Sequence, residues 1–307
     1  MTDGAKRVAV IDVGTNSTRL LVADVADGRV SPLERRSTVT RLGRGVDLSG
    51  HLASEAIEDV CTAIGGYVGI VEELGAETVD AIATSAVRDA DNGSAFVAEL
   101  RERFALSARV LDGEEEARST YMGATSEAAP TEPTLVVDIG GGSTELIVGS
   151  GTEISFHDSL QVGVVRHTER HVSSDPPTAL ELEALAADVR GLIEDSLGAG
   201  VEARRGIAVA GTPTSLAAVE LGLEPYDPSR VHGHVLALPS IQRMLSSLAS
   251  VPLAERVETP GLHPDRAPNI VAGVVILVET MRAFGLEEIG VSEHDILYGT
   301  ALAAGAR

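Results

Sequence analysis

The sequence predicts an α/β protein of two domains, each built on a mixed β-sheet. The chain has 307 residues, about twice the length of a typical single domain. Buried-strand patterns alternate with helical periodicity through both halves. In addition, a segment near the N-terminus recurs 126 residues later, so that each half opens in the same way.

The first half is expected to fold in the order β-β-β-α-β-α-β-α. Its opening strands are rich in β-branched and apolar residues, and a turn at Ala26-Asp27-Gly28 joins the second strand to the third. Apolar residues then recur at helical spacing from Ile57 to Leu74, and Gly75 ends this helix. The expected strands are 7–13, 18–25, 29–38, 78–84 and 108–111, and the expected helices are 54–74, 93–104 and one from about 114.

The second half begins after residues 126–133, a short polar segment that contains two prolines. We place the domain boundary here, with one domain at 1–128 and the other at 129–307. The last helix is expected to pack back on the first domain. The expected strands are 134–137, 145–148, 153–159, 206–210 and 288–291, and the expected helices are about 178–197, 214–221, 239–248, 268–284 and 295–306.

Charge and cysteine content exclude several classes of protein. Lys and Arg number 24 against 46 Asp and Glu, and the net charge of −22 gives no positive field to attract nucleic acid or an anionic membrane. The single cysteine, Cys61, excludes an internal disulfide and a CxxC pair, which suggests a reducing compartment. The N-terminus shows no signal-peptide pattern, and no 18-residue apolar run occurs. We therefore expect a cytoplasmic protein that binds neither nucleic acid nor membrane.

Residues 10–22 align with residues 136–148 without a gap, and seven of the thirteen positions are identical. Each copy is a strand, an aspartate, a tight turn of small residues and a second strand. Such a turn can direct several backbone N–H groups at one anion, and the aspartate can hold a cation or a water. One Asp-x-Gly turn alone is usually only the turn of a β-hairpin, but a duplicated pair favours a phosphate bound by both turns. Arg19 aligns with Glu145, so the copies differ in charge.

The two turns resemble the phosphate loops of the actin, sugar-kinase and Hsp70 superfamily. Four further segments, at residues 83–92, 112–118, 138–145 and 266–277, resemble exopolyphosphatases and guanosine pentaphosphate phosphohydrolases, the Ppx/GppA phosphatases. The resemblance implies two duplicated actin-like (ribonuclease H-like) domains with mixed sheets around a central cleft. Longer family members carry a C-terminal helical extension, and its lack here would favour short polyphosphate chains.

The resemblance also implies catalytic and metal-binding residues. Glu116 matches the glutamate that activates the attacking water, and Arg88 matches an arginine that clamps phosphoryl oxygens. Asp138 and Glu145, with Asp12 from the first domain, match the ligands of Mg²⁺, for which Mn²⁺ is the alternative.

The residues alone leave other interpretations open for these positions. Glu114, Glu115 and Glu116 are also compatible with a solvated first helical turn that complements the helix dipole. Arg88 could pair with a neighbouring aspartate at the surface instead of binding phosphate. Arg266 could cap the helix that follows it rather than contact substrate.

A wider set of residues is implied to bind phosphate. They are Gly14, Thr15, Asn16, Ser17, Arg19, Gly140, Gly141, Gly142, Ser143, Thr144, Gly211, Thr212 and Arg266. Gly211 and Thr212 follow a strand and open a helix, which is a third place for an anion. The sequence departs from the family pattern at Ala210, where glycine is more usual, and at Leu297 and Tyr298, where the family commonly has charged residues.

The activity implied is Mg²⁺-assisted, in-line attack of water on the terminal phosphoryl group of inorganic polyphosphate. Guanosine pentaphosphate is the alternative substrate and would connect the protein with the stringent response. An ATP-using actin-like kinase or activator ATPase, and a non-catalytic polyphosphate or alarmone sensor, fit less well. The resemblance implies a homodimer. A polyanion would need a local patch of arginines in this acidic chain, for which the candidates are Arg19, Arg41, Arg44, Arg88 and Arg266.

Overall fold

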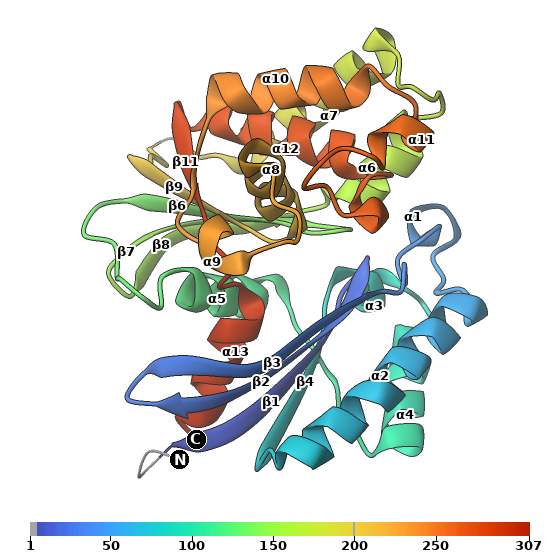
Figure 1. The fold of residues 1–307 in the computed structure, drawn as a ribbon, viewed down its shortest axis with the longest axis vertical. Helices are drawn as coiled ribbons and strands as arrows, with labels where there is room; N and C mark the ends of the chain where they lie inside the picture. Colours follow the sequence, from blue (N-terminus) through green and yellow to red (C-terminus); the bar gives the residue numbers. More distant parts are fainter. Residues whose placement is uncertain (1–4, 199) are drawn as a thin grey trace. The chain divides into compact units, whose positions relative to one another are not determined.

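The computed structural model describes residues 5–198 and 200–307 (Figure 1). The chain divides into two compact units. The first unit is the described part of Met1–Ala128 together with His294–Arg307, and the second is Ala129–Glu293 with the same restriction. Each unit contains one β-sheet with both parallel and antiparallel neighbours. The two mixed sheets confirm the α/β fold class predicted from the sequence.

The sheet of the first unit has the strand order β3-β2-β1-β4-β5. Its strands are β1 (Lys6–Val13), β2 (Ser17–Ala26), β3 (Arg29–Val39), β4 (Thr78–Ala83) and β5 (Arg109–Val110). Its helices are α1 (Val46–Ser49), α2 (Ser54–Leu74), α3 (Ser85–Asp89), α4 (Gly93–Phe104), α5 (Gly113–Ala124) and α13 (Ile296–Gly305). The first three strands are antiparallel, whereas β4 runs parallel to β1.

Successive residues of β1 point to opposite faces of this sheet, as the period of a strand requires. Ala9 and Ile11 belong to a buried cluster with side chains of α2 and α4. Val8 and Val10 instead belong to a cluster with side chains of α13. Figure 1 shows α2 and α4 on one side of the sheet and α13 on the other. The last helix of the chain therefore completes the core of the first unit.

The sheet of the second unit has the order β10-β11-β9-β6-β7-β8. Its strands are β6 (Thr134–Ile139), β7 (Thr144–Ser150), β8 (Glu153–Leu160), β9 (Arg205–Val209), β10 (Val235–Ala237) and β11 (Glu288–Val291). Its helices are α6 (Val164–His171), α7 (Ala179–Ser196), α8 (Gly211–Leu221), α9 (Pro228–Val231), α10 (Leu238–Ala249), α11 (Leu253–Arg256), a 3₁₀ turn η1 (Pro264–Arg266) and α12 (Ile270–Ala283). An antiparallel meander followed by a parallel strand, β6-β7-β8 and β9, repeats the arrangement of β1-β2-β3 and β4.

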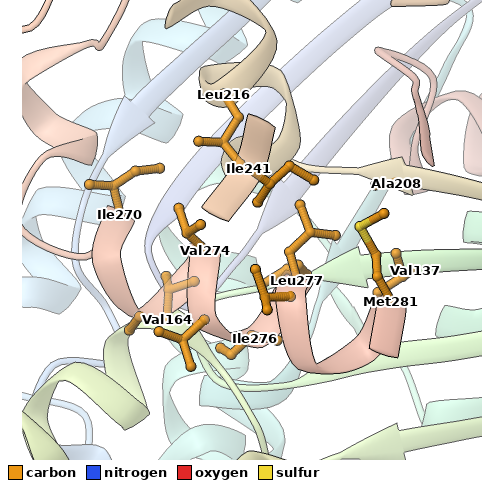
Figure 2. Close-up of a cluster of buried hydrophobic side chains, with 14 of the residues drawn as sticks. Val137, Val164, Ala208, Leu216, Ile241, Ile270, Val274, Ile276, Leu277 and Met281 are labelled. Carbon is orange, nitrogen blue, oxygen red and sulfur yellow. The ribbon is translucent and has the colours of Figure 1, made fainter. Parts of the chain in front are cut away.

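Helix α12 is the centre of the second hydrophobic core. Twelve of its fourteen residues are buried, which explains why its sequence is apolar on nearly every side. Figure 2 shows side chains of α12 packed among Val137 of β6, Val164 of α6, Leu216 of α8 and Ile241 of α10. The N-terminal end of α6 is thus fixed by the core at the point where it meets the glycine-rich turn between β6 and β7.

The differences from the predicted elements are concentrated in short segments. The helices α1, α3, α6, α9 and α11 and the strand β10 were not expected from the sequence. Each of these helices has eight residues or fewer, which is too few for helical periodicity to show clearly, and β10 has only three residues. Two of these, α3 and α6, lie next to candidate site residues. Within the two described ranges, no helix combines the length and the apolar character needed to cross a bilayer.

Candidate phosphate-binding turns and acidic site

The two duplicated turns have the same backbone geometry. In the first, the N–H of Gly14 donates to the carbonyl of Ser17 at 3.1 Å, and in the second, the N–H of Gly140 donates to the carbonyl of Ser143 at 3.0 Å. A β-carbon on Gly14 would lie 2.9 Å from Ser17 O, and one on Gly140 would lie 3.0 Å from Ser143 O. Glycine at both positions is therefore required by the close approach of the backbone across the turn.

In the second turn, three successive carbonyls are held by the start of α6. The N–H groups of Val164 and Val165 donate to the carbonyls of Gly140 and Gly141, at 3.0 and 2.9 Å. The side chain of Arg166 donates from Nε to the carbonyl of Gly142 at 2.9 Å. Since the peptide unit is planar and trans, the following N–H of each unit points the opposite way. The three amides of residues 141–143 thus point away from α6, an arrangement that suits an anion.

In the first turn, the carbonyls are held by a different structure, the loop after β3. The N–H of Gly43 donates to Thr15 O at 2.8 Å, and those of Thr40 and Arg41 donate to Asn16 O at 3.1 and 3.0 Å. The side chain of Thr15 accepts a hydrogen bond from the N–H of Ala86 at 3.3 Å. The turn is therefore braced from two sides, and planarity again directs the N–H of Asn16 away from the loop.

Two glycines that the sequence analysis did not single out allow these close contacts. A β-carbon on Gly43 would lie 2.2 Å from Cγ2 of Thr15, and one on Gly163 would lie 2.3 Å from the carbonyl oxygen of Gly141. Each glycine follows the third strand of its meander. That shared position in the duplicated halves is the signal by which the sequence could have identified them.

Asp12 is the residue before the last of the buried strand β1, and it lies opposite Arg19 of β2 in the antiparallel register. Arg19 donates from Nη2 to Oδ2 of Asp12 at 2.6 Å, and it also bonds the carboxylate of Asp295. Asp12 is 2% exposed, and its Oδ1 makes no hydrogen bond within the described part of the chain. Burial raises the pKa of Asp12, Asp295 adds to this effect, and the positive charge of Arg19 opposes it.

Asp295 is a buried site residue that the sequence analysis did not identify. It caps α13, with Oδ1 accepting the N–H of Leu297 at 3.0 Å. Its position is fixed by close packing of α13 on α5, because a β-carbon on Gly123 would lie only 1.9 Å from Asp295 O. The final helix therefore brings a carboxylate to Arg19 from a point 276 residues along the chain.

Glu116 lies in the first turn of α5 and is 6% exposed. Arg88, at the end of the short helix α3, donates from Nη1 to Oε2 of Glu116 at 2.9 Å and to the carbonyl of Leu111 at the same distance. Burial raises the pKa of Glu116, the contact with Arg88 lowers it, and the charge of Asp12 raises it further. Glu116, Arg88 and Asp12 therefore interact within one unit.

The structure separates Glu116 from the two glutamates that precede it. Glu115 is exposed and forms a capping box with Asp112, in which its N–H donates to Oδ1 of Asp112 at 2.8 Å. Glu114 is exposed and pairs with Arg118 one turn later at 3.2 Å. These two have the solvated, helix-stabilising role that three consecutive glutamates suggest. Only Glu116 among the three is buried.

Asp138 and Glu145 occupy in the second unit the positions of Asp12 and Arg19 in the first. They lie opposite each other on β6 and β7, and residues at facing positions have their side chains on the same face. Asp138 is 8% exposed and Glu145 is 1% exposed. Oε1 of Glu145 accepts a hydrogen bond from Ser159 at 2.9 Å. Two adjacent buried carboxylates form the hard oxygen donor set that Mg²⁺ prefers, so these residues fit a magnesium ion.

The remaining candidates of the second unit meet at the start of α8. The guanidinium of Arg266 packs on Gly211, where a β-carbon would lie 2.7 Å from Arg266 Cζ. Thr212 is buried, and its hydroxyl packs against Gly273 of α12, where a β-carbon would lie 2.3 Å from Oγ1. Ala210 has φ of 73° and ψ of −167°, a region that is almost confined to glycine. The usual glycine of the family would fit this backbone without strain.

The other predicted arginines and the cysteine lie apart from these groups. Arg41 and Arg44 are exposed on the loop that braces the first turn. Cys61 is buried in the core of the first unit, and burial raises the pKa of its thiol. The arginines of the first unit that were predicted to form one patch thus lie in two different environments. Arg19 and Arg88 bind buried carboxylates, whereas Arg41 and Arg44 face solvent.

Comparison with known proteins identifies relatives that cover nearly the whole chain. The model of the Ppx/GppA phosphatase family matches residues 21–303. Exopolyphosphatase 2 of Mycobacterium tuberculosis is 36% identical over 312 aligned residues, which cover 96% of this chain and 98% of the relative. A crystal structure of an exopolyphosphatase-like protein matches with a TM-score of 0.93 and 34% identity, covering 99% of each chain. A Ppx/GppA family member of Aquifex aeolicus matches with a TM-score of 0.84 and 31% identity, covering 97% of each chain.

Proposed function

Because the chain belongs to the Ppx/GppA phosphatase family, we propose that it is an exopolyphosphatase, which releases orthophosphate from the end of inorganic polyphosphate. The family match confirms the family resemblance and the hydrolase class that were predicted from the sequence. One structural observation carries the catalytic part of the proposal. Among three consecutive glutamates, Glu116 alone is buried. Burial raises the pKa of its carboxyl group, and Arg88 contacts the carboxylate inside the first unit.

Glu116 is assigned the role of general base. A base is most effective when its pKa lies near the working pH, and burial moves the pKa of this carboxylate in that direction. The oxygen of the attacking water forms a bond to the terminal phosphorus while the anhydride P–O bond breaks, and a proton of the water passes to Glu116. Arg88 orients the Glu116 carboxylate through the 2.9 Å hydrogen bond.

The backbone of both turns is assigned the role of phosphate binding. In the second unit, the amides of residues 141–143 point away from α6, and they stabilise the negative oxygens of a phosphate. In the first unit, the N–H of Asn16 has the corresponding orientation. Arg266, packed on Gly211, adds a positive charge at the start of α8.

Asp138 and Glu145 are assigned as ligands of Mg²⁺, with Mn²⁺ as a substitute. When bound, the metal neutralises charge on the phosphoryl oxygens. Asp12, the third ligand implied by the resemblance, has its Oδ2 engaged by Arg19, whereas its buried Oδ1 makes no hydrogen bond within the described residues. The support for this assignment is the pair of buried carboxylates at facing positions of β6 and β7.

The proposal is tested by measuring phosphate release from polyphosphate, guanosine pentaphosphate and ATP, each with and without Mg²⁺. We expect Mg²⁺-dependent release from polyphosphate, and loss of that release in Glu116→Gln. Preferential release from guanosine pentaphosphate would identify the alternative substrate. Turnover of ATP alone would indicate the kinase or ATPase class, and binding of polyphosphate without release would indicate a sensor. The expected homodimer and cytoplasmic location are separate predictions, tested by light scattering and by cell fractionation.

A further inference from the structure

A buried histidine lies directly behind the second phosphate turn. His167 is on α6, one helical turn after Gly163, and its side chain is 0% exposed. Its Nδ1 accepts a hydrogen bond from the N–H of Gly163 at 3.3 Å. Gly163 is the residue whose lack of a side chain lets α6 begin against the carbonyl of Gly141. His167 therefore contacts the residue at which α6 and the turn meet.

The other edge of the imidazole faces helix α7. Nε2 of His167 lies 3.5 Å from Oδ2 of Asp188 and makes no hydrogen bond within the described residues. The same carboxylate oxygen lies 2.7 Å from Nε2 of His171 and 3.4 Å from Nη1 of Arg170. Asp188 is thus the acidic group shared by three basic side chains of α6.

Two histidines and an aspartate with donor atoms within 4.8 Å of one another could in principle hold a metal ion. The hydrogen bond from Gly163 argues against this use. A nitrogen that accepts a hydrogen bond carries no proton, so the proton of neutral His167 is on Nε2, and Nε2 then has no lone pair for a metal. Burial lowers the pKa of His167 to about 4, and the ring is therefore neutral at pH 7. The geometry favours a series of side-chain contacts in which the imidazole of His167 lies between the carboxylate of Asp188 and the N–H of Gly163.

We propose that His167 is a positioning residue for the second phosphate turn: with Nε2 directed at Asp188, 3.5 Å away, it accepts the N–H of Gly163 at Nδ1 and keeps the first turn of α6 against the carbonyls of residues 140–142. The three turn amides then remain directed away from α6. This inference rests on the proposed phosphate binding by the turn. It adds a residue outside the turn, on a separate helix, that determines how well the turn binds.

Two substitutions separate the two edges of the ring. In His167→Asn, the side-chain oxygen takes the place of Nδ1 and can still accept from Gly163. In His167→Gln, the amide takes the place of Nε2 and reaches toward Asp188, but the acceptor for Gly163 is lost. Val189→Ala, a truncation of a fully buried side chain on α7, serves as a control for loss of stability alone. Asp188→Asn, at a position 30% exposed, tests the contact between Asp188 and His167 without disturbing the core.

The first measurement is steady-state kinetics on tripolyphosphate. We expect His167→Gln to raise KM about tenfold with kcat within about twofold, because one hydrogen bond that orients the turn is lost. His167→Asn should keep KM within about threefold of wild type, and Asp188→Asn should raise KM by a smaller factor than His167→Gln. Val189→Ala should lower the melting temperature and leave KM unchanged.

The second measurement, hydrogen exchange followed by mass spectrometry, does not depend on activity. Peptides covering residues 163–167 should exchange at least several-fold faster in His167→Gln than in wild type, while peptides covering residues 12–18 should be unchanged. Equal exchange and equal KM in wild type and His167→Gln would overturn the inference. Stoichiometric binding of Zn²⁺ to wild type, abolished in His167→Gln and Asp188→Asn, would also overturn it in favour of a metal site. If wild type releases no phosphate, the proposed function fails, and the exchange result still decides the role of His167.

Discussion

The two duplicated turns share a backbone and differ in the charge of one side chain. In the first unit, Asp12 faces Arg19 across β1 and β2, and in the second, Asp138 faces Glu145 across β6 and β7. The first pair is an ion pair at 2.6 Å, whereas the second is two buried carboxylates. A single change of residue type at the same register position therefore separates a site that carries its own cation from one suited to bind a metal.

The two turns also differ in the structure that braces them. The loop at residues 40–43 holds the carbonyls of the first turn, and the start of α6 holds those of the second. Both structures need a glycine at the contact, Gly43 in one and Gly163 in the other. The requirement that persists after duplication is thus the orientation of the turn carbonyls, because that orientation directs the amides.

The largest expected effect tests the proposed general base, Glu116, which lies in the first unit. Glu116→Gln should lower kcat about 10²-fold or more with little change in KM, because the amide keeps the shape but cannot accept the proton of the water. Phosphate release from polyphosphate, measured at saturating Mg²⁺, gives kcat and KM directly.

Glu115→Gln is the matched control for this prediction. Its side chain is exposed and belongs to the capping box, so it should lower stability by at most about 1 kcal/mol and leave kcat near the wild-type value. If the two variants lose turnover equally, the base is not Glu116, and the comparison between buried and exposed glutamates has no catalytic meaning.

The next effect tests the pair of carboxylates in the second unit. Glu145→Gln and Asp138→Asn should each raise the concentration of Mg²⁺ that gives half-maximal rate by about tenfold or more, and excess Mg²⁺ should restore part of the rate. Ser159→Ala removes only the hydroxyl that donates to Glu145 and should cause a smaller shift in the same direction. Metal dependence that stays unchanged in all three variants would remove this pair from the metal site.

How much of this arrangement the sequence predicts can be judged from particular residues. The duplicated turns were predicted because they are local: strand, aspartate and small residues follow one another directly. Helix α4 and strand β11 also lie at their predicted bounds. The role of Glu116 came from the family resemblance, because three consecutive glutamates in a first helical turn are also compatible with a solvated turn that complements the helix dipole.

What the sequence could not predict are contacts between distant segments. Asp295 reaches Arg19 only because α13 packs on the first sheet, and no local pattern marks an aspartate at a helix start as the partner of an arginine so far away. The helices α3 and α6 were too short to be recognised, although α3 carries Arg88 and α6 orders the second turn. Site residues contributed by short elements are therefore the hardest to find by periodicity.

A smaller effect should follow from replacing Asp295, the second carboxylate that bonds Arg19. In Asp295→Asn, the new side chain can still cap α13, but it removes a negative charge from Arg19. We expect kcat/KM to fall about fivefold, corresponding to a loss of about 1 kcal/mol, with no change in Mg²⁺ dependence. Asp227→Asn makes the same change at the cap of α9 in the second unit and should leave the kinetics unchanged. A shift in Mg²⁺ dependence in Asp295→Asn would mean that the two turns do not have separate roles.

The smallest expected effect concerns the residues that connect each parallel strand to the helix after it. Thr84 follows β4 with φ of −119° and ψ of −151°, whereas Ala210 follows β9 with nearly the same ψ but φ of 73°. Ala210 pays a conformational penalty that Thr84 does not, because a β-carbon is disfavoured in this region. Ala210→Gly should therefore raise the free energy of unfolding by about 1 kcal/mol, measured by urea denaturation, while Thr84→Gly should lower it, since glycine gains entropy in the unfolded chain. If both variants are destabilised, the strain at Ala210 is balanced by contacts of its methyl group, and the two connections are equivalent in energy despite their different backbones.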